Sequence, residues 1–485
     1  MMKAGNCRKN RCFKNGIPMN NVNYTGIKYF IRKVEALFEV LLLAFIYYWL
    51  WSHLYRPVGH FPYYGNGKFV LMGVYALLTF ILFYYCESFR FGYLKAADAT
   101  VAQWIAISIV NFVTYFQLCL MSNHMLQLWP MLLLTILDYL VCLELVYLYT
   151  AIYHQVYVPK DMLMIYGNRK AITLKLKMES RSDKYHISKI LSCNEDAELL
   201  KAEILKHDAV IINDVRAEKR NDILKFCYGN KVRTYIVPKI TDIIDRGAEE
   251  ITLFDTPLLL VKGYGPTLMQ LSLKRAMDII FCLIALIPCA PVMAVVALAI
   301  KLEDHGPVFY KQTRVTKDEK HFEILKFRSM IVNAEKEGKS IPAVDHDPRI
   351  TKVGRVIRAV RIDELPQLFN ILKGDMSIVG PRPERVEHYE QYCAEIPEFR
   401  FRTKVKGGLT GYAQIIGKYN TSAYDKLRLD LMYIEKYSVI LDLKLILMTI
   451  QILLKPESTE GFDKVISVDD VLSQLEKENS RSVRG

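Results

Sequence analysis

Two adjacent carboxylates, Asp363 and Glu364, stand at the start of a helix-like segment, ELPQLFNIL, in which apolar residues recur at helical spacing. A carboxylate that stays ionised can act as a nucleophile or general base, and a neighbouring acid can share a divalent metal ion. An N-cap is the simplest alternative for Asp363, because Asp is common at helix starts. Pro366 lacks the amide hydrogen that such a cap would use, and the electropositive helix end favours the anion. The nucleophile and the cap therefore both remain open.

Cations that suit a diphosphate lie on both sides of this pair in the sequence. The alternating stretch 321–330 reads as a strand with Lys326 and Arg328 on one face, about 7 Å apart. A solvated face is the alternative for this strand. Arg382 lies between two prolines whose φ angles are fixed, so its guanidinium has little entropy to lose on binding phosphate. These cations make phosphoryl transfer the first hypothesis for the carboxylate pair.

The composition excludes several other functions. The chain has 485 residues and a formal net charge of +13, but no basic block interleaved with aromatic residues and no finger-type motif, so we expect no nucleic-acid partner. A positive cytoplasmic face beside anionic lipid accounts for the charge. The 10 cysteines include no CxxC pair and no His/Cys cluster, which argues against a zinc site and a disulfide framework.

The first third of the chain has the pattern of a transmembrane domain, residues 34–155. It contains four apolar segments that each approach the ~20 residues that a helix needs to span a hydrocarbon core, namely 34–51, 69–85, 101–121 and 131–153. The basic leader, residues 1–33, should be cytoplasmic, and the loop SNHMLQLW, which lacks Lys and Arg, should face outward. Glu144 in the fourth segment marks either a functional site or a hydrogen bond to another helix.

Residues 156–266 predict a soluble α/β domain. The stretches MLMIYG, AVIIND, VRTYIV and LLLV read as short buried strands separated by helical segments, which is the order of a parallel sheet. Only YGNRKA follows the first strand, and one glycine cannot provide both the tight turn and the close pyrophosphate approach of a dinucleotide fold. We therefore expect a degenerate Rossmann-like domain that binds no dinucleotide and is dispensable for chemistry.

A fifth apolar segment, residues 273–301, is long enough to span a membrane but has Pro288 and Pro291 in its middle. Each proline removes a helical hydrogen bond and clashes with the preceding turn, so the pair predicts a break or a kink. A kinked spanning helix is the alternative, but it would put the cation-rich sequence that follows outside the cell. Because cations flank both ends, with Lys274 and Arg275 at the entry, we expect a re-entrant helix whose two ends anchor at the cytoplasmic leaflet.

Residues 427–455 keep an apolar face with cations spaced along it, which is the pattern of an amphipathic helix in the membrane interface. A helix packed on a protein core is the alternative. The catalytic region extends over residues 267–457, and residues 458–485 form a polar tail. The expected fold class is thus a membrane α+β protein with four transmembrane helices, an α/β domain and a monotopic catalytic domain with amphipathic interfacial helices.

A series of motifs in residues 273–455 resembles the bacterial sugar transferases, which are monotopic polyprenyl-phosphate phosphoglycosyltransferases that start exopolysaccharide, capsule and O-antigen repeat units. In order, the motifs are KRAMDI, the proline-containing apolar segment, QTRV, KFRSM, DPRITKVGRVIR, DELPQLFNILKGDMSIVGPRPE and GLTGYAQI. The preceding membrane segments and α/β domain resemble the long form of that family in architecture only.

The resemblance implies a two-step reaction. Asp363 would attack the β-phosphate of a UDP-sugar and release UMP, and undecaprenyl phosphate would then take the phospho-sugar from Asp363. Glu364 matches the family's dyad glutamate, which is associated with Mg²⁺. Other matching positions are three basic phosphate contacts and one acid near the active site, namely Lys326, Arg358, Arg382 and Asp430. The resemblance also implies the bacterial inner membrane, a catalytic domain on its cytoplasmic face, contact with membrane lipid, and a homodimer.

The sequence departs from the family pattern at four places, none of which touches the dyad. They are Ala290-Pro291 for a Ser-Pro, Val405-Lys406-Gly407-Gly408 for VKPG, Arg361-Ile362 before the dyad, and Gly417-Lys418-Tyr419-Asn420 where Gly-Arg-Asn is common. The last departure leaves nucleotide or sugar contacts there unassigned.

Two other functions stay open. A non-catalytic membrane scaffold or nucleotide sensor of a polysaccharide assembly complex would have no use for the dyad with Lys326 and Arg382, and UMP release would distinguish it. A polytopic phosphoglycosyltransferase would need many more spanning segments with acidic loops between them. The residues do not decide the sugar, and galactose or glucose is the expectation from the family's membership.

Overall fold

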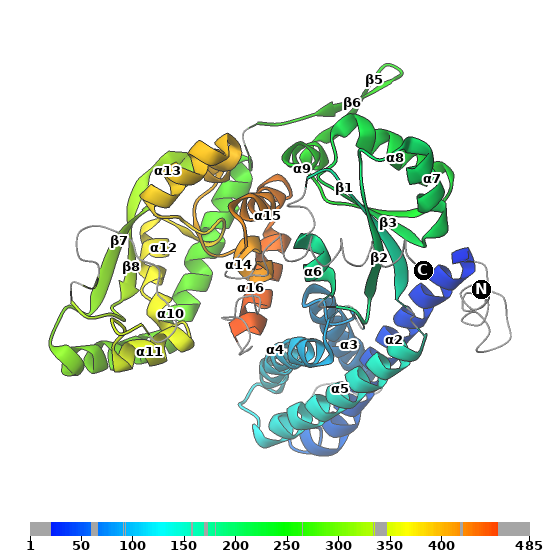
Figure 1. The fold of residues 1–485 in the computed structure, drawn as a ribbon. Coiled ribbons are helices and arrows are strands. Elements are labelled where there is room, and N and C mark those ends of the chain that lie inside the picture. Colours follow the sequence, from blue (N-terminus) through cyan, green and yellow to red (C-terminus); the bar gives the residue numbers. More distant parts are fainter. Residues whose placement is uncertain are drawn as a thin grey trace. The chain divides into compact units, whose positions relative to one another are not determined.

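The protein is described by a computed structural model that divides into two compact units, residues 1–157 and 158–485 (Figure 1). The described residues are 21–59, 66–90, 92, 94–156, 159–168, 173–179, 181–263, 265–332, 334, 347–417 and 421–453. Most of the predicted basic leader and the whole predicted polar tail lie outside them.

The first unit consists of apolar helices that coincide with the four predicted membrane segments. They are α2 (Asn21–Leu50) with the π-helical turn η1 (Trp51–Tyr55), α3 (Gly67–Tyr85), α4 (Ala96–Ser122) and α5 (Trp129–Val156). All four are long and apolar enough to cross a membrane. Phe45, Phe80 and Phe112 are exposed on them, as a surface in contact with lipid requires. Several apolar helices and the sheets described below make this a membrane α+β protein.

Buried polar side chains lie inside this helical unit. The Tyr75 hydroxyl donates to Asn111 and Asp138 at 2.8 and 3.0 Å, and Glu39 is fully buried. Glu144 is exposed on α5, so the suggested hydrogen bond to another helix is wrong. Glu144 lies six positions after Asp138, about 120° around the helix from it, and of the two only Asp138 is buried.

The second unit begins with a four-stranded parallel sheet in the order β2-β1-β3-β4. Its strands are β1 (Lys160–Tyr166), β2 (Tyr185–Ser192), β3 (Ala209–Asn213) and β4 (Arg233–Ile236), and its helices are α6 (Thr173–Glu179), α7 (Ala197–Lys206), α8 (Ala217–Gly229) and α9 (Ile240–Gly247). The alternation of strands and helices is as expected. A dinucleotide fold has the strand order 3-2-1-4-5-6, which this sheet reproduces only in part, so the Rossmann-like assignment stays a prediction.

Two strands of this region differ from the expectation. β2 was missed because it is an edge strand whose sequence, YHISKILS, alternates with polar residues. LLLV was expected as a buried strand of the parallel sheet, but it lies at the end of an exposed antiparallel hairpin, β5 (Glu249–Leu253) and β6 (Thr256–Leu260). An apolar run alone does not tell a buried strand from an exposed one.

The catalytic region follows the hairpin. Its helices and turns are α10 (Leu268–Asp304), η3 (Lys317–Glu319), α11 (Lys352–Ala359), η5 (Ile362–Glu364), α12 (Gln367–Lys373), α13 (Val386–Glu395), η6 (Pro397–Lys404), α14 (Tyr412–Ile416), α15 (Ala423–Glu435) and α16 (Val439–Leu453). Its strands form an antiparallel pair, β7 (Phe309–Val315) with β8 (His321–Phe327), and a parallel pair, β9 (Ser377–Val379) with β10 (Gly408–Thr410).

The fifth apolar segment is helical throughout, so the two prolines do not interrupt the helix, and the kink that they also predicted stays a prediction. α10 is one continuous helix with Pro288 and Pro291 inside it. Each proline costs one backbone hydrogen bond, and Leu286 and Cys289 pack beside them against two buried clusters of the catalytic region, which supports the helix there. α10 is also long and apolar enough to cross a membrane, so its length and composition do not distinguish a spanning helix from a re-entrant one.

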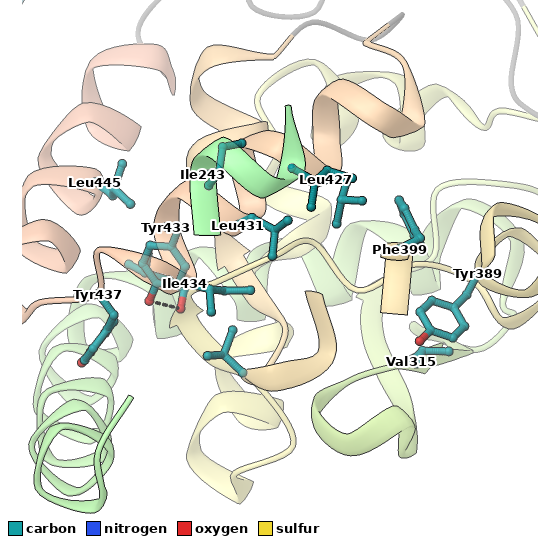
Figure 2. Close-up of a cluster of buried hydrophobic side chains, with 13 residues drawn as sticks. Ile243, Val315, Tyr389, Phe399, Leu427, Leu431, Tyr433, Ile434, Tyr437 and Leu445 are labelled. Atoms are coloured by element: carbon teal, nitrogen blue, oxygen red, sulfur yellow. Dashed lines mark hydrogen bonds between the residues drawn. The ribbon is translucent and has the colours of Figure 1, made fainter. Parts of the chain in front are cut away.

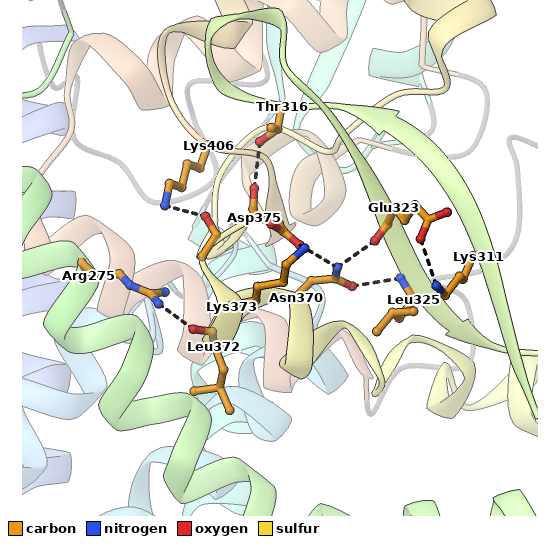
Figure 3. A network of polar contacts seen from close by, with 11 residues as sticks. Arg275, Lys311, Thr316, Glu323, Leu325, Asn370, Leu372, Lys373, Asp375 and Lys406 are labelled. Carbon is orange, nitrogen blue, oxygen red and sulfur yellow. Dashed lines mark hydrogen bonds and ion pairs between the residues drawn. The ribbon is translucent and has the colours of Figure 1, made fainter.

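The expected lipid anchors at the start of α10 are used inside the protein. Lys274 is buried and forms a 2.7 Å ion pair with Asp442 of α16, which also accepts from the Tyr433 hydroxyl. Arg275 donates to the carbonyls of Ile371 and Leu372 at the end of α12 (Figure 3). Neither cation is therefore available to bind lipid headgroups.

The largest buried cluster of the catalytic region joins α15, α16 and α9 (Figure 2). The single interfacial helix expected over residues 427–455 is therefore wrong: two helices form, and Leu427 and Leu431 of the first lie in a protein core. Ile240 and Ile243 of α9 share that core. The expected dispensability of the α/β region stays untested, but a truncation that removes α9 would expose Leu427 and Leu431.

Candidate active site

The carboxylate pair lies in a short turn ahead of α12. Arg361 precedes it with a φ of 57°, in the left-handed region, and Asp363 and Glu364 complete the 3-10 turn η5. The residue that caps α12 is Pro366, and no side chain makes a cap hydrogen bond there. The N-cap alternative for Asp363 is therefore wrong, and its carboxylate is left for another use.

Glu364 brings two of the predicted cations together. Its Oε1 atom accepts a 2.8 Å ion pair from Lys326 Nζ on β8 and a 2.6 Å ion pair from Arg382 Nη2. Burial acts to raise the pKa of Glu364, but the charges of Arg382 and Lys326 outweigh burial and hold the pKa well below its usual range. Glu364 is thus an anion at any physiological pH, and it fixes the separation of the two cations.

Asp363 is in a different electrostatic state from its neighbour. Burial raises the pKa of Asp363 and the Glu364 charge adds to this, while Lys326, Arg358 and Arg382 act in the opposite direction. The expectation that a helix end would dominate and favour the anion is therefore not met, because burial is the larger effect. All three basic residues assigned from the family resemblance are close enough to act on Asp363.

A buried amide fixes the helix of the dyad against the strand of Lys326. Asn370 of α12 accepts from the Leu325 amide at 2.9 Å and donates to the Glu323 carbonyl at 2.8 Å (Figure 3). Asn370 thereby continues the hydrogen bonding of β8 onto α12. Leu325 directly precedes Lys326, so the bridge sets the distance between that lysine and the dyad.

Two predicted site residues lie elsewhere. Strand β8 ends at Phe327, so Arg328 does not continue the face of Lys326; it is buried and pairs with Asp304 at the end of α10. Asp430 of α15 is fully buried and pairs at 2.8 Å with Arg402. Neither side chain pairs with the dyad; each is held by its own ion-pair partner, and a phosphate contact for either one stays a prediction.

Two arginines near Arg382 were missed from the sequence, the buried Arg402 and the partly buried Arg314. Arg402 and Arg314 donate to the backbone of the proline segment at 2.9 and 3.3 Å. The QTRV motif contains Arg314 and could have directed attention to it. No pattern singles out Arg402, because its partner Asp430 is 28 positions away in the sequence.

The arrangement suits phosphoryl transfer. Asp363 lies beside cations that are held by an adjacent anion and that favour its ionised form, and Arg382 keeps 41% of its side chain exposed for a ligand. Among the described residues, no group of three His, Cys, Asp or Glu side chains gathers to hold a metal ion. A metal here would need ligands from the substrate, which is how Mg²⁺ is commonly held.

The region that contains the dyad is also the part of the chain that matches known proteins. Residues 269–456 match the family described as bacterial sugar transferase. The chain is 44% identical over 192 residues to the UDP-N-acetylgalactosamine-undecaprenyl-phosphate N-acetylgalactosaminephosphotransferase of Aeromonas hydrophila, covering 39% of this chain and 45% of that one. It is 39% identical over 212 residues to the UDP-glucose:undecaprenyl-phosphate glucose-1-phosphate transferase of Caulobacter vibrioides, covering 42% and 78%.

The chain belongs to the bacterial sugar transferase family. A protein of Klebsiella pneumoniae with the same glucose-1-phosphate transferase name is 39% identical over 249 residues, covering 50% of this chain and 51% of that one. The chain thus spans about half the length of the Aeromonas and Klebsiella relatives. The match begins at α10, so the dyad, β8, Arg382 and Asp430 all fall within it.

Proposed function

We propose that this protein transfers a sugar 1-phosphate from a UDP-sugar to undecaprenyl phosphate and releases UMP. The reaction would be the first membrane step of exopolysaccharide, capsule or O-antigen synthesis. One observation carries the proposal: Asp363 adjoins a glutamate that holds two cations, Lys326 and Arg382. Glucose and galactose are the proposed sugars, and relatives named for glucose or N-acetylgalactosamine support a hexose.

The proposed chemistry has two displacements at one phosphorus atom. A carboxylate oxygen of Asp363 attacks the β-phosphorus of the UDP-sugar, a P–O bond to Asp363 forms, and the bond to the bridging oxygen breaks, so that UMP leaves with the electron pair. A phosphate oxygen of undecaprenyl phosphate then attacks the same phosphorus and releases the carboxylate. Both steps need neutralisation of negative charge more than covalent assistance. Lys326, Arg358 and Arg382 would provide that neutralisation.

We propose that Mg²⁺ assists this site through Glu364. Both ion pairs of Glu364 use Oε1, so its second oxygen remains for a metal that phosphate oxygens and water would also hold. The bound ion would neutralise developing charge on the diphosphate. Glu364 itself keeps the two cations in position, and this role does not depend on the metal.

We propose that α10 is re-entrant and that the catalytic region lies on the cytoplasmic face of the inner membrane. Both ends of α10 support this, because Arg275 contacts α12, and Glu303 accepts from the Lys352 amide at 2.8 Å. A spanning helix would separate these ends by a hydrocarbon core about 30 Å thick. The apolar residues exposed along α10 would face lipid, namely Ile280, Leu283, Ile284, Ile287, Val292, Val295, Leu298 and Leu302.

Cysteine labelling tests this topology. A cysteine introduced at Lys317, in a background without other accessible cysteines, should resist a membrane-impermeant reagent in intact cells and react after lysis. Replacing Pro288 and Pro291 with alanine should let some molecules span and gain label as activity falls. Labelling of the parent protein from outside would contradict the cytoplasmic placement.

A panel of UDP-sugars tests the function and the sugar together. The purified full chain, reconstituted in nanodiscs with undecaprenyl phosphate, should release UMP from UDP-glucose or UDP-galactose. An Asp318→Asn variant serves as a matched control, since Asp318 is an exposed carboxylate away from the dyad. Absence of UMP with every sugar would favour the scaffold or sensor alternative. The proposed homodimer would be measured on the same preparation by mass photometry.

A further inference from the structure

The segment Pro381–Glu384 is held by its carbonyl groups. Each of its four consecutive carbonyl oxygens accepts a hydrogen bond within this structure. The donors are Gly408 N to Pro381 at 2.8 Å, Arg402 Nη2 to Arg382 at 2.9 Å, Arg314 Nη1 to Pro383 at 3.3 Å, and Val315 N to Glu384 at 3.0 Å. Two of the four residues are prolines without an N–H, so carbonyl acceptors are the main means of fixing this backbone.

The Arg382 carbonyl depends on a side chain that comes from a distant element. Arg402, on η6, is only 4% exposed, and its guanidinium lies 4.7 Å from the centre of the Phe399 ring. Asp430 pairs with it at 2.8 Å, and Glu384 lies 3.5 Å away. The guanidinium is therefore fixed by a ring and two carboxylates, and it presents Nη2 to the Arg382 carbonyl.

The burial of Arg402 excludes a direct role at the substrate. A side chain that is 4% exposed and enclosed by Phe399, Asp430 and Glu384 has no surface left for a diphosphate. Its link to the dyad is indirect, because Arg402 holds the backbone of Arg382, whose side chain pairs with Glu364. A shift of the Arg382 backbone would move the guanidinium away from Glu364 and from any ligand.

We propose that Arg402 is a positioning residue that orients Arg382 for the substrate diphosphate, and that Asp430 acts by holding Arg402 and does not itself contact the substrate. This inference rests on the proposed function, since it assigns Arg382 to the diphosphate. It gives Asp430 a role different from that of an acid beside the reacting groups. Arg314, which holds the next carbonyl, provides a second support of the same kind.

The test is a double-mutant cycle that is measured as affinity for UDP, which carries the diphosphate without a sugar. The full-length protein in nanodiscs is titrated by calorimetry, so that no turnover is needed. The perturbing variant is Arg402→Gln with Asp430→Asn, because changing Arg402 alone would leave Asp430 buried without a counter-charge. Arg382→Lys provides the second axis of the cycle, and Arg400→Gln, on the same turn but exposed, is the matched control.

We expect the Arg402/Asp430 variant to bind UDP about tenfold more weakly than the wild type, the size of one lost charge-assisted hydrogen bond. In the Arg382→Lys background the same change should have almost no further effect, because the residue that it positions is no longer an arginine. Arg400→Gln should bind as the wild type does. An Arg402→Lys variant keeps a positive charge opposite Asp430 but lacks the guanidinium donor, and it should also weaken binding. This variant replaces the Arg402/Asp430 variant if thermal unfolding shows that the latter is not folded.

The remaining outcomes would overturn either the positioning role of Arg402 or the proposed function. Wild-type affinity in a folded Arg402/Asp430 variant, or an equal loss in both backgrounds, would make Arg402 a structural residue only. A wild-type protein that neither binds UDP nor releases UMP would instead overturn the proposed function, and the assignment of Arg382 with it.

Discussion

The catalytic region contains two clusters of paired ions that use the same residue types in opposite ways. In one cluster Lys274 pairs with Asp442, and their side chains are 8% and 3% exposed. The Tyr433 hydroxyl donates a hydrogen bond to the other oxygen of Asp442. In the other cluster Glu364 forms ion pairs with both Lys326 and Arg382, and the Arg382 side chain remains 41% exposed. The first cluster is balanced and closed, and it joins α10 to α16. The second has excess positive charge and an open side, as a site for an anion requires.

The comparison shows that charge balance separates structural from functional ion pairs better than burial does. Both carboxylates have little exposed surface, 3% for Asp442 and 15% for Glu364, so exposure alone does not single out the dyad. A group that is fully paired inside the protein has nothing left for a ligand. Changes in the open cluster should therefore affect activity more than stability, and changes in the closed cluster should do the reverse.

The largest expected effect is on the nucleophile. Asp363→Asn should lower UMP release by at least roughly a thousandfold, because an amide cannot form the phospho-sugar bond. The folded state should be retained, since no described residue donates a hydrogen bond to Asp363. Turnover of Asp363→Asn at more than a few per cent of the wild-type rate would argue against a covalent role.

Glu364→Gln should have the next largest effect. Without the negative charge, Lys326 and Arg382 repel each other and lose their common partner, so kcat/KM should fall on the order of a hundredfold. The Mg²⁺ concentration for half-maximal rate should also rise. Initial rates over a magnesium titration would measure both effects, and an unchanged magnesium dependence would remove Glu364 from the metal site.

Lys274→Met should act on stability. It leaves Asp442 buried without a counter-charge, which costs about 3–5 kcal/mol, whereas Lys274→Met with Asp442→Leu should recover much of that loss. Denaturant unfolding in detergent would measure the difference, with the exposed Lys320→Met as control. A large fall in kcat for folded Lys274→Met would contradict the structural reading of this cluster.

Arg358→Gln should give the smallest effect, a shift of pH dependence. The Arg358 charge lowers the pKa of Asp363 against the effect of burial, so its removal lets that pKa rise further. Asp363 would then become protonated at a higher pH, and the acid limb of kcat/KM would move upward. Arg355→Gln, on the same helix, should leave the limb in place. A downward shift for Arg358→Gln would contradict the electrostatic account.

The structure brings together the central residues that the sequence singled out, whereas the sequence did not identify most of the residues that support them. The dyad, Lys326 and Arg382 were found because adjacency, strand alternation and flanking prolines are local patterns. Arg328 does not share the strand face of Lys326, because β8 ends one residue earlier and alternation predicts nothing beyond a strand end. Asp430 was placed near the active site, but its partner Arg402 comes from a distant segment, and such pairs form only through tertiary packing.

The fold shows the same division. The membrane segments, the three strands MLMIYG, AVIIND and VRTYIV, and α12 follow from periodicity. Lys274 and Arg275 were expected at the lipid surface because they flank an apolar segment, yet each found a partner inside the protein. The contribution of α9 to the core around Leu427 was equally invisible in the sequence, since a helix pattern identifies an apolar face but not the surface against which it packs.

The central claim is that Asp363 carries the phospho-sugar, and peptide mass spectrometry tests it most directly. The full chain in nanodiscs is incubated with the active UDP-sugar and no acceptor, quenched, digested and analysed. We predict a phospho-hexose adduct on Asp363, absent from Asp363→Asn and lost within seconds when undecaprenyl phosphate is added. An adduct on another residue, or full turnover without any adduct in rapidly quenched samples, would contradict the account.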